Sequence, residues 1–523
     1  LAAWVEAPDP TCIHASTGPD TPAILSESLG APVTAIAVST LDRRIFAAAP
    51  PRVYVLAVPR PESRSQDLRV LQSLDSDGLS IARLELTAHD GTLQAFDPAG
   101  RETARWGGKA TALPPSTRQT APPTGIALAV DGLDAHELFG FAIAGDDQWL
   151  AATSMFDSAY RGEAIGSVSV YRRDTLGIPE RYPVARLNPR QGRQNDHAND
   201  VAVGDGLVLL SSPNAATPGR PRRGVIRVFR WDAQQWSEEP EIPAPDTTSD
   251  NGGFASRLAY SGGVLVVTEP RALDPQGHPC GAVWVYTRQG RGWSEPVRLA
   301  HPGTRTAGSF GISVCIRASA DHATLVVGDC DDPGASGYKT GSVVVFERRG
   351  DQWTPTAEIL PEEGERDARF GEAVLMQGDE LMIGGPGLDG GTGRIDVFHL
   401  GDASTWVKTS SLRSPADHAG SAFGASLAQS GGLLASGARY TREGGVPRGQ
   451  VVLFRRQEHD WAPAGVIPAP AELSPASEFG CSIWTDGNIL CAGAPFHDSP
   501  GPDSGAVWVF GVGNGPATAP NRP

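Results

Sequence analysis

Residues 479–510 read FGCSIWTDGNILCAGAPFHDSPGPDSGAVWVF, and this stretch decides the fold. Two apolar runs, 481–484 and 489–492, flank the pair Asp486-Gly487. Asp-Gly between apolar runs is a strong hairpin signal, because Gly accepts a positive φ in a two-residue turn. A third run, 507–510, alternates apolar residues after Gly505. The stretch is therefore predicted to form three antiparallel strands.

The same pattern recurs along most of the chain. Its leading Phe slot returns every 53 to 60 residues, at Phe139, His197, Phe254, Phe310, Phe370, Phe423 and Phe479. Each copy also has a Gly before its third apolar run, namely Gly166, Gly224, Gly281, Gly341, Gly393, Gly449 and Gly505. A fourth run often opens with Trp and ends in an aliphatic residue and Pro, as at Ile359-Leu360-Pro361. Each copy predicts a four-stranded antiparallel unit, and seven copies predict an all-β, seven-bladed β-propeller.

The seventh copy stops after its third strand, at Phe510-Gly511. Directly before Phe139 lies an unassigned apolar segment, 125–130, at the distance that separates a fourth strand from the next copy. We expect this segment to complete the last blade, because a ring closed in this way leaves no exposed sheet edge. The domains are then 1–123, a β-rich N-terminal region with a Pro-rich linker; 124–511, the propeller; and 512–523, a flexible tail.

The N-terminal region does not follow the repeat. Apolar runs at 33–38, 44–46, 53–56, 79–82 and 91–96 indicate strands. They are consistent with a small appended domain, which we favour, or with degenerate blades that would give an eight- or nine-bladed ring.

The order Phe-Gly, a buried run ending in Gly-Ala-Pro at 493–495, and then Gly-x-Val-x-Val-Phe resembles the FG-GAP repeat. This family includes the integrin α-subunit head and many bacterial surface proteins. The resemblance covers about 375 residues and implies a propeller used outside the cell for binding. Integrin-like blades often carry an Asp-x-Asp-x-Asp-Gly calcium loop, which is absent here. The nearest turns, 145–147 and 328–332, are shorter or poorer in acid, so we expect no cofactor, with calcium at one of these turns as the alternative.

Composition limits the partners. Gly (62) and Pro (44) are abundant, while the apolar fraction of 40% is that of a globular protein, as expected for turn-dense β-structure. The net charge of −16 argues against nucleic acid and anionic membranes. No apolar run is long enough to predict a transmembrane segment. Because the chain begins at Leu1, we expect a processed start, for which a cleaved export signal is one route.

Six cysteines occur without a Cys-x-x-Cys motif, which leaves zinc and thioredoxin-type chemistry unsupported. Cys481 and Cys491 lie on the two strands of one predicted hairpin, and Cys315 and Cys330 straddle another. Facing residues on antiparallel strands are within disulfide range, so these two pairs are predicted bonds. Cys12 with Cys280 then follows by elimination. The alternative is six buried thiols. Disulfides would place the protein outside the reducing cytosol, that is secreted, periplasmic or on the cell surface.

Little in the sequence indicates catalysis. Zinc-protease, nucleophile-elbow and phosphate-loop motifs are absent. His197 with Asp196 and Asp200 is the nearest approach to a catalytic cluster, but His197 fills the slot of a packed Phe. The paired loop acids Asp331-Asp332, and Asp389, are weak metal candidates. The residues therefore favour a binding protein over an enzyme.

The topology predicts where binding takes place. Loops joining strands two and three, and loops leading to the next blade, share one rim, and the long, varied loops all fall there. Binding residues tend to lie on loops held by a rigid scaffold, and aromatic and Arg side chains dominate interfaces. The candidates are Tyr160, Arg161, Arg220, Arg222, Arg223, Tyr338, Tyr440, Arg442, Phe496 and His497.

We therefore expect an extracytoplasmic adhesion module for a protein or a surface glycan. The alternatives are a structural subunit of a larger assembly, and a hydrolase or lyase at the mouth of the propeller channel.

Overall fold

A computed structural model provides the three-dimensional description. It describes ten strands between Ala2 and Trp106, whose side chains are not described, and residues 125–513 apart from short loop segments. Those segments are 131–132, 158–164, 175–176, 190–194, 217–221, 249–250, 304–307, 320, 334–338, 363–364, 402–404, 416–418 and 459. The expected linker up to residue 123 and most of the expected tail lie outside the described residues.

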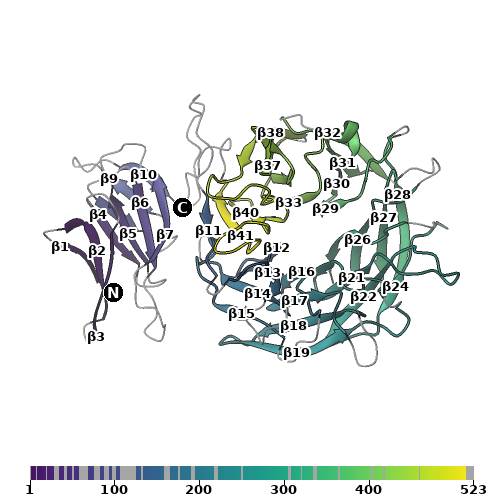
Figure 1. Ribbon diagram of the computed structural model, residues 1–523, viewed down its shortest axis with the longest axis horizontal. Coiled ribbons are helices and arrows are strands. Elements are labelled where there is room, and N and C mark those ends of the chain that lie inside the picture. Colours follow the sequence, from purple (N-terminus) through teal and green to yellow (C-terminus); the bar gives the residue numbers. More distant parts are fainter. Residues whose placement is uncertain are drawn as a thin grey trace. The chain divides into compact units, whose positions relative to one another are not determined.

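Residues 126–511 form a seven-bladed β-propeller, as the repeat predicts (Figure 1). Each blade is an antiparallel sheet in which consecutive strands pair, with its first strand toward the centre of the ring and its last strand outside. Blades 1 to 3 are β12 (Phe139–Gly145), β13 (Trp149–Asp157), β14 (Ile165–Arg172) and β15 (Ala185–Leu187); β16 (Asp200–Gly204), β17 (Leu207–Ser212), β18 (Val225–Trp231) and β19 (Trp236–Pro243); and β20 (Leu258–Ser261), β21 (Val264–Glu269), β22 (Ala282–Gln289), β23 (Gly292–Trp293) and β24 (Val297–Leu299).

In blade 3 the fourth strand is interrupted, and β23 and β24 both pair with β22. Blades 4 to 6 are regular, with a one-turn helix α1 (Leu388–Gly391) in blade 5 and a small hairpin, β35 (Arg442–Glu443) and β36 (Val446–Pro447), in blade 6. Their strands are β25 (Ser313–Ala318), β26 (His322–Asp329), β27 (Ser342–Arg349) and β28 (Gln352–Ile359); β29 (Ala373–Gln377), β30 (Glu380–Gly385), β31 (Arg394–Leu400) and β32 (Trp406–Leu412); and β33 (Ser426–Ser430), β34 (Leu433–Gly437), β37 (Gln450–Gln457) and β38 (Asp460–Pro468).

Blade 7 joins the two ends of the ring. It contains β39 (Ile483–Thr485), β40 (Ile489–Ala494) and β41 (Ala506–Gly511), and its outer strand is β11 (Ile126–Ala127), which precedes blade 1. Leu128 N donates to Val507 O at 2.8 Å, and Figure 1 shows β11 beside the yellow strands of blade 7. The segment 125–130 therefore supplies the strand that the seventh repeat lacks.

The repeated Gly of one blade meets the repeated Phe of the next blade at each of the six junctions where the slot holds Phe rather than His197. The Phe side chains are fully buried, and each Gly holds a positive φ directly against the backbone of the next Phe. A Cβ placed on Gly449 would lie 2.2 Å from Phe479 O, and one on Gly505 would lie 2.2 Å from Phe139 O. The junction of the last blade with the first thus has the geometry of an internal junction. Only Gly allows strands of neighbouring blades to approach this closely.

A hydroxyl also joins the blades at three junctions. Ser482 Oγ donates to Gly140 O at 2.7 Å, which bonds blade 7 to blade 1. Ser313 and Ser426 donate in the same way to Gly371 and Gly480 of the following blades. The apolar core lies between consecutive blades rather than at the ring centre, as in the cluster that joins Leu209 and Val228 of blade 2 to Leu265 and Trp284 of blade 3.

The Trp that opens the fourth strand packs on the rim opposite the long loops. In three blades an Arg faces it directly across the strand pair and lies over its ring. Cation–π contacts of this kind contribute about 0.5–1 kcal/mol at exposed sites. The pairs, with distances from the guanidinium carbon to the ring centroid, are Arg288 and Trp293 (4.9 Å), Arg348 and Trp353 (6.0 Å), and Arg456 and Trp461 (4.6 Å).

The N-terminal strands form three antiparallel sheets of their own and give no strand to the seven blades. These strands belong to a different compact unit from most of the ring. The sheets are β1 (Ala2–Glu6), β2 (Asp9–Gly18) and β3 (Thr21–Ser28); β4 (Ala35–Ser39), β5 (Arg44–Ala49), β6 (Arg52–Ala57) and β7 (Arg69–Asp75); and β8 (Arg83–Leu86), β9 (Leu93–Phe96) and β10 (Glu102–Trp106). No helix in the described part of the chain combines the length and the apolar content needed to cross a membrane.

The disulfide predictions within hairpins are wrong. Cys315 faces Val326 rather than Cys330, which lies just beyond the end of β26, and both are free thiols. Cys491 faces Trp484, and Cys481 is a free thiol that precedes β39. The register is offset from the symmetric pairing that the sequence suggests, and such an offset separates residues equidistant from a turn. Cys280, the expected partner of Cys12, is also a free thiol, and the side chain of Cys12 lies outside the described residues.

Candidate binding site

Three loops on the loop-rich rim enclose an open pocket of about 1000 Å³, here called the rim pocket. One loop leads from blade 5 to blade 6, the second joins strands two and three of blade 6, and the third leads from blade 6 to blade 7. All three are of the two kinds that the topology assigns to one rim. The lining residues are Ala419, Gly420, Arg439, Tyr440, Arg442, Gly444, Gly445, Pro447, Ala476 and Glu478.

The outer wall of the rim pocket is the hairpin β35–β36. Its two turn residues, Gly444 and Gly445, have φ values of +58° and +84°, as a tight hairpin turn of the primed type requires. Arg442 Nη1 donates to Gly445 O at 3.0 Å, and its side chain remains exposed. The hairpin therefore presents a guanidinium at the edge of the pocket.

Arg439 and Tyr440 form the inner wall. The Arg439 guanidinium carbon lies 5.0 Å from the centroid of the Tyr440 ring, while Tyr440 is 42% exposed. Arg439 Nη1 lies 3.7 Å from Cys481 Sγ, and its Nε lies 3.9 Å from Glu478 Oε2. Burial raises the pKa of Glu478, and the charge of Arg439 opposes that rise. Arg stacked on an aromatic ring is held in one orientation, which leaves the pocket preorganised.

A second group of ionisable side chains lies just before the first strands of blades 3, 5 and 7. Burial raises the pKa values of the Glu372 carboxyl and the Cys481 thiol, and both Arg439 and Arg257 lower them. Arg369 Nε also pairs with Glu372 Oε2 at 2.6 Å. Arg257, Glu372 and Cys481 belong to blades 3, 5 and 7, which are not neighbours, and the charge of Arg257 lowers the pKa values of the other two groups.

Two of the sequence candidates, Tyr440 and Arg442, line the rim pocket. Arg223 is 4% exposed and holds the loop to the next blade, since its Nε donates to Thr248 Oγ1 at 3.0 Å and its Nη2 donates to Pro245 O. Its neighbour Arg222 is exposed.

Phe496 is half-buried, and His497 Nδ1 accepts from Ser474 N at 3.1 Å. Burial lowers the pKa of His497. His497 therefore joins a loop of blade 7 to the loop that precedes this blade. The remaining candidates lie outside the described residues: Tyr160, Arg161, Arg220 and Tyr338.

Arg439, Glu478, Arg257 and Glu372 are not among the residues that the sequence predicts for the site. Three of them lie within three residues of a repeated Phe, which the fold places where the chain enters a blade. Charged residues at those positions of a repeat are a weak signal, since equivalent positions of other copies also hold charged residues, namely Asp196, Asp200 and Arg369.

The residues of the candidate catalytic cluster make separate contacts. Asp196 is buried and pairs with Arg227, while Asp200 Oδ2 accepts from Leu258 N at 2.9 Å. The His197 ring packs on Phe156 with centroids 4.6 Å apart, and burial lowers its pKa. This is the packed histidine that the repeat predicts.

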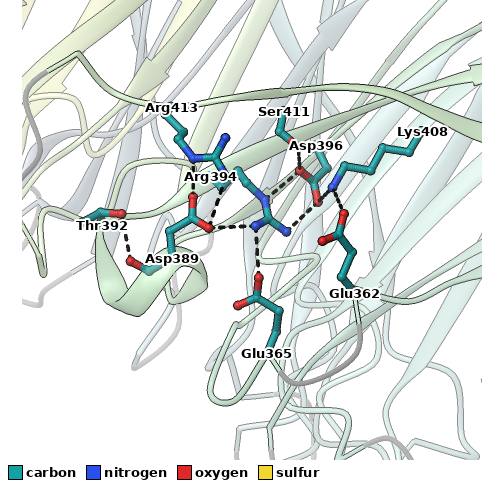
Figure 2. Close-up of polar contacts among 9 residues, drawn as sticks. All are labelled: Glu362, Glu365, Asp389, Thr392, Arg394, Asp396, Lys408, Ser411 and Arg413. Carbon is teal, nitrogen blue, oxygen red and sulfur yellow. Dashed lines mark hydrogen bonds and ion pairs between the residues drawn. The ribbon is translucent and has the colours of Figure 1, made fainter.

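The acidic metal candidates are engaged by protein groups. Figure 2 shows Asp389 between Arg394 and Arg413, at 2.8 Å and 2.7 Å. Arg394 is 3% exposed and pairs in a bidentate manner with Asp396, whose carboxylate also accepts from Ser411 Oγ. The network also holds the loop that enters blade 5, through Glu362 and Glu365. It is a structural brace between loops rather than an open site.

One group with metal-ligand spacing is found among the described residues, formed by His301, Asp332 and Glu358. His301 Nε2 lies 3.8 Å from Glu358 Oε1 and 4.0 Å from Asp332 Oδ2. His301 Nδ1 accepts from Gly303 N at 3.0 Å, which places the proton of the neutral ring on Nε2. A His that binds a metal through one ring nitrogen donates a hydrogen bond from the other nitrogen. In His301 the Nδ1 atom accepts a hydrogen bond, so Nε2 carries the proton and suits a hydrogen-bond donor rather than a metal ligand. Asp331, the second acid of that loop, pairs with Lys339 at 2.9 Å.

Comparison with known proteins adds little. No protein-family model and no curated protein matches the sequence. A similar solved structure is the crystal structure of the β-propeller domain of Cps50 (Swd1) from Myceliophteria thermophila, at 12% identity and a TM-score of 0.43. The similarity covers 74% of this chain and 100% of that one.

Proposed function

We propose that this protein is a non-enzymatic binding module that acts outside the cytoplasm and holds a protein or a surface glycan on its loop-rich rim. The observation that carries the proposal is the rim pocket, where three loops converge around the exposed ring of Tyr440. Its volume of about 1000 Å³ lies at the upper end of the range for ligand sites. The resemblance to FG-GAP repeats supports the extracytoplasmic part of the proposal.

The ionisable groups that the structure describes before the first strands of blades 3, 5 and 7 also favour binding over catalysis. They are arginines, glutamates and the Cys481 thiol, whose pKa burial raises and which is therefore a poor nucleophile, and the described members include no histidine. No described feature favours the two alternatives, an assembly subunit or a hydrolase or lyase.

The test is an array of glycans and cell-surface proteins probed with the purified full chain. We expect at least one ligand whose binding is weakened by about tenfold or more in Tyr440→Ala, the loss of one well-placed aromatic contact. Val407→Ala is the matched control, because Val407 is 52% exposed on the outer strand of blade 5. Ligands that bind both variants as they bind the original chain would show that the rim pocket is not the site.

A further inference from the structure

The charges around the rim pocket have one predominant sign. Arg442 and Arg439 line it, whereas Glu478 is the single acid among the described lining residues. The chain as a whole carries a net charge of −16, so this cationic band is local. Arginine binds carboxylates with two parallel hydrogen bonds, which gives geometric selection as well as attraction.

Tyr440 offers an apolar surface at the centre of this band. The Arg439 guanidinium lies over one face of its ring, and Tyr440 as a whole is 42% exposed. The C–H face of a sugar ring is apolar and flat, and it stacks on an aromatic ring while its hydroxyls point to the sides. Glu478, whose Oε2 lies 3.9 Å from Arg439 Nε, and the exposed Arg442 are further polar groups of the pocket lining.

The shape of the rim pocket favours a glycan over a peptide. Half of its ten described lining residues are Gly or Ala, and none is a large aliphatic residue. Protein partners anchor through apolar or aromatic side chains in deep, well-packed pockets, which this lining does not provide. The volume is also larger than one sugar ring needs, so several rings of a chain fit.

We propose that the ligand of the rim pocket is a linear glycan with carboxylated sugar residues, one ring of which stacks on Tyr440 while its carboxylate pairs with Arg442. This inference rests on the proposed function and narrows it to one ligand class.

The experiment compares the binding of the full chain to immobilised polygalacturonate and alginate with its binding to methyl-esterified polygalacturonate, which has the same sugar backbone without the charge. Poly-L-glutamate is the control for a charged peptide. We expect at least one polyuronate to bind about tenfold or more tighter than the methyl ester. Arg442→Gln should weaken that binding by about tenfold and reduce its dependence on salt. Tyr440→Ala should weaken it to a similar extent.

The matched control is Arg271→Gln, since Arg271 is another exposed arginine on the same rim, in the loop between β21 and β22 of blade 3. Its binding should stay within about twofold of the original chain. Circular dichroism and the melting midpoint of each variant establish that the propeller is folded.

Other outcomes separate this inference from the proposed function. If the methyl ester binds as tightly as the acid and Tyr440→Ala weakens both, glycan binding stands and the role of the carboxylate is refuted. If poly-L-glutamate binds as tightly and depends on the same two residues, the ligand class is acidic peptide and the inference is overturned. Absence of binding to both polyuronates also overturns it, while the array test of the rim pocket remains independent.

Discussion

Substitution of Gly505 by Ala tests the closure of the ring. Gly505 has a φ of +87°, and its Cβ would lie 2.2 Å from Phe139 O and 2.3 Å from Phe139 N. The left-handed conformation costs an Ala residue about 1–2 kcal/mol. Relief of the contact requires blades 7 and 1 to separate by about 1 Å, and overpacking of this kind typically costs a further 1–3 kcal/mol. We therefore expect Gly505→Ala to lower the free energy of unfolding by about 2–5 kcal/mol.

Two further variants separate the causes. At Gly444 the φ is +58° and nothing lies within 4 Å of the Cβ, so Gly444→Ala carries only the backbone cost of about 1–2 kcal/mol. At Gly449 the Cβ would lie 2.2 Å from Phe479 O, an internal junction of the same geometry. Gly449→Ala should therefore resemble Gly505→Ala.

The assay is unfolding in guanidinium chloride followed by tryptophan fluorescence, with the three variants compared at equal concentration. A Gly505→Ala midpoint equal to that of Gly444→Ala, with Gly449→Ala clearly lower, would show that the first and last blades do not meet as described. Equal midpoints for all three would show that the repeated glycines matter only for their φ.

Three other predictions concern the described interior. Arg394→Met should cost about 3–5 kcal/mol in thermal unfolding, because it leaves the buried Asp396 carboxylate without its bidentate partner. Arg413→Gln should lower the free energy of unfolding by less than about 1 kcal/mol, because the Arg413 side chain is 55% exposed. Equal losses of stability in the Arg394 and Arg413 variants would show that Arg394 is not the centre of the brace. Burial raises the pKa of Asp329 from 3.8 to about 7, so the folded chain keeps a proton that the unfolded chain releases. The free energy of unfolding should then fall as pH rises from about 4 to 7, and urea titrations of Asp329→Asn should lack that decline. Protein that is unfolded without reduction should react with a thiol reagent at the five cysteines whose side chains are described, namely Cys280, Cys315, Cys330, Cys481 and Cys491. Fewer reactive thiols would restore the disulfide predictions.

The sequence was a poor guide to contacts that depend on register. A shift of one or two residues in a hairpin changes which side chains face each other, and the repeat pattern does not specify it. Cys315 and Cys330 lie on opposite sides of a turn, yet the pairing places Val326 opposite Cys315. Spacing from a turn gives the approximate position of a partner, whereas hydrogen bonding through the whole blade decides its identity.

In the candidate site, too, the sequence predicts the approximate location of residues but not their contacts. The order of strands determines which rim carries the long loops, so Tyr440 and Arg442 could be chosen from the sequence. Arg223 was chosen on the same grounds, but its guanidinium is bonded to a neighbouring loop. Whether an arginine is open to a ligand depends on carbonyls more than twenty residues away, and composition gives no measure of that.

The sequence by itself determined the blades, their number and the strand that closes the ring, because each blade is specified by local apolar runs, turn residues and one Phe and one Gly per repeat. Only the tertiary structure shows which residues face the cysteines, which loop arginines are engaged, and that the charges of Arg439 and Arg257 act on Glu372. Those residues come from different blades, and their proximity arises only when the ring closes and brings distant segments around one axis.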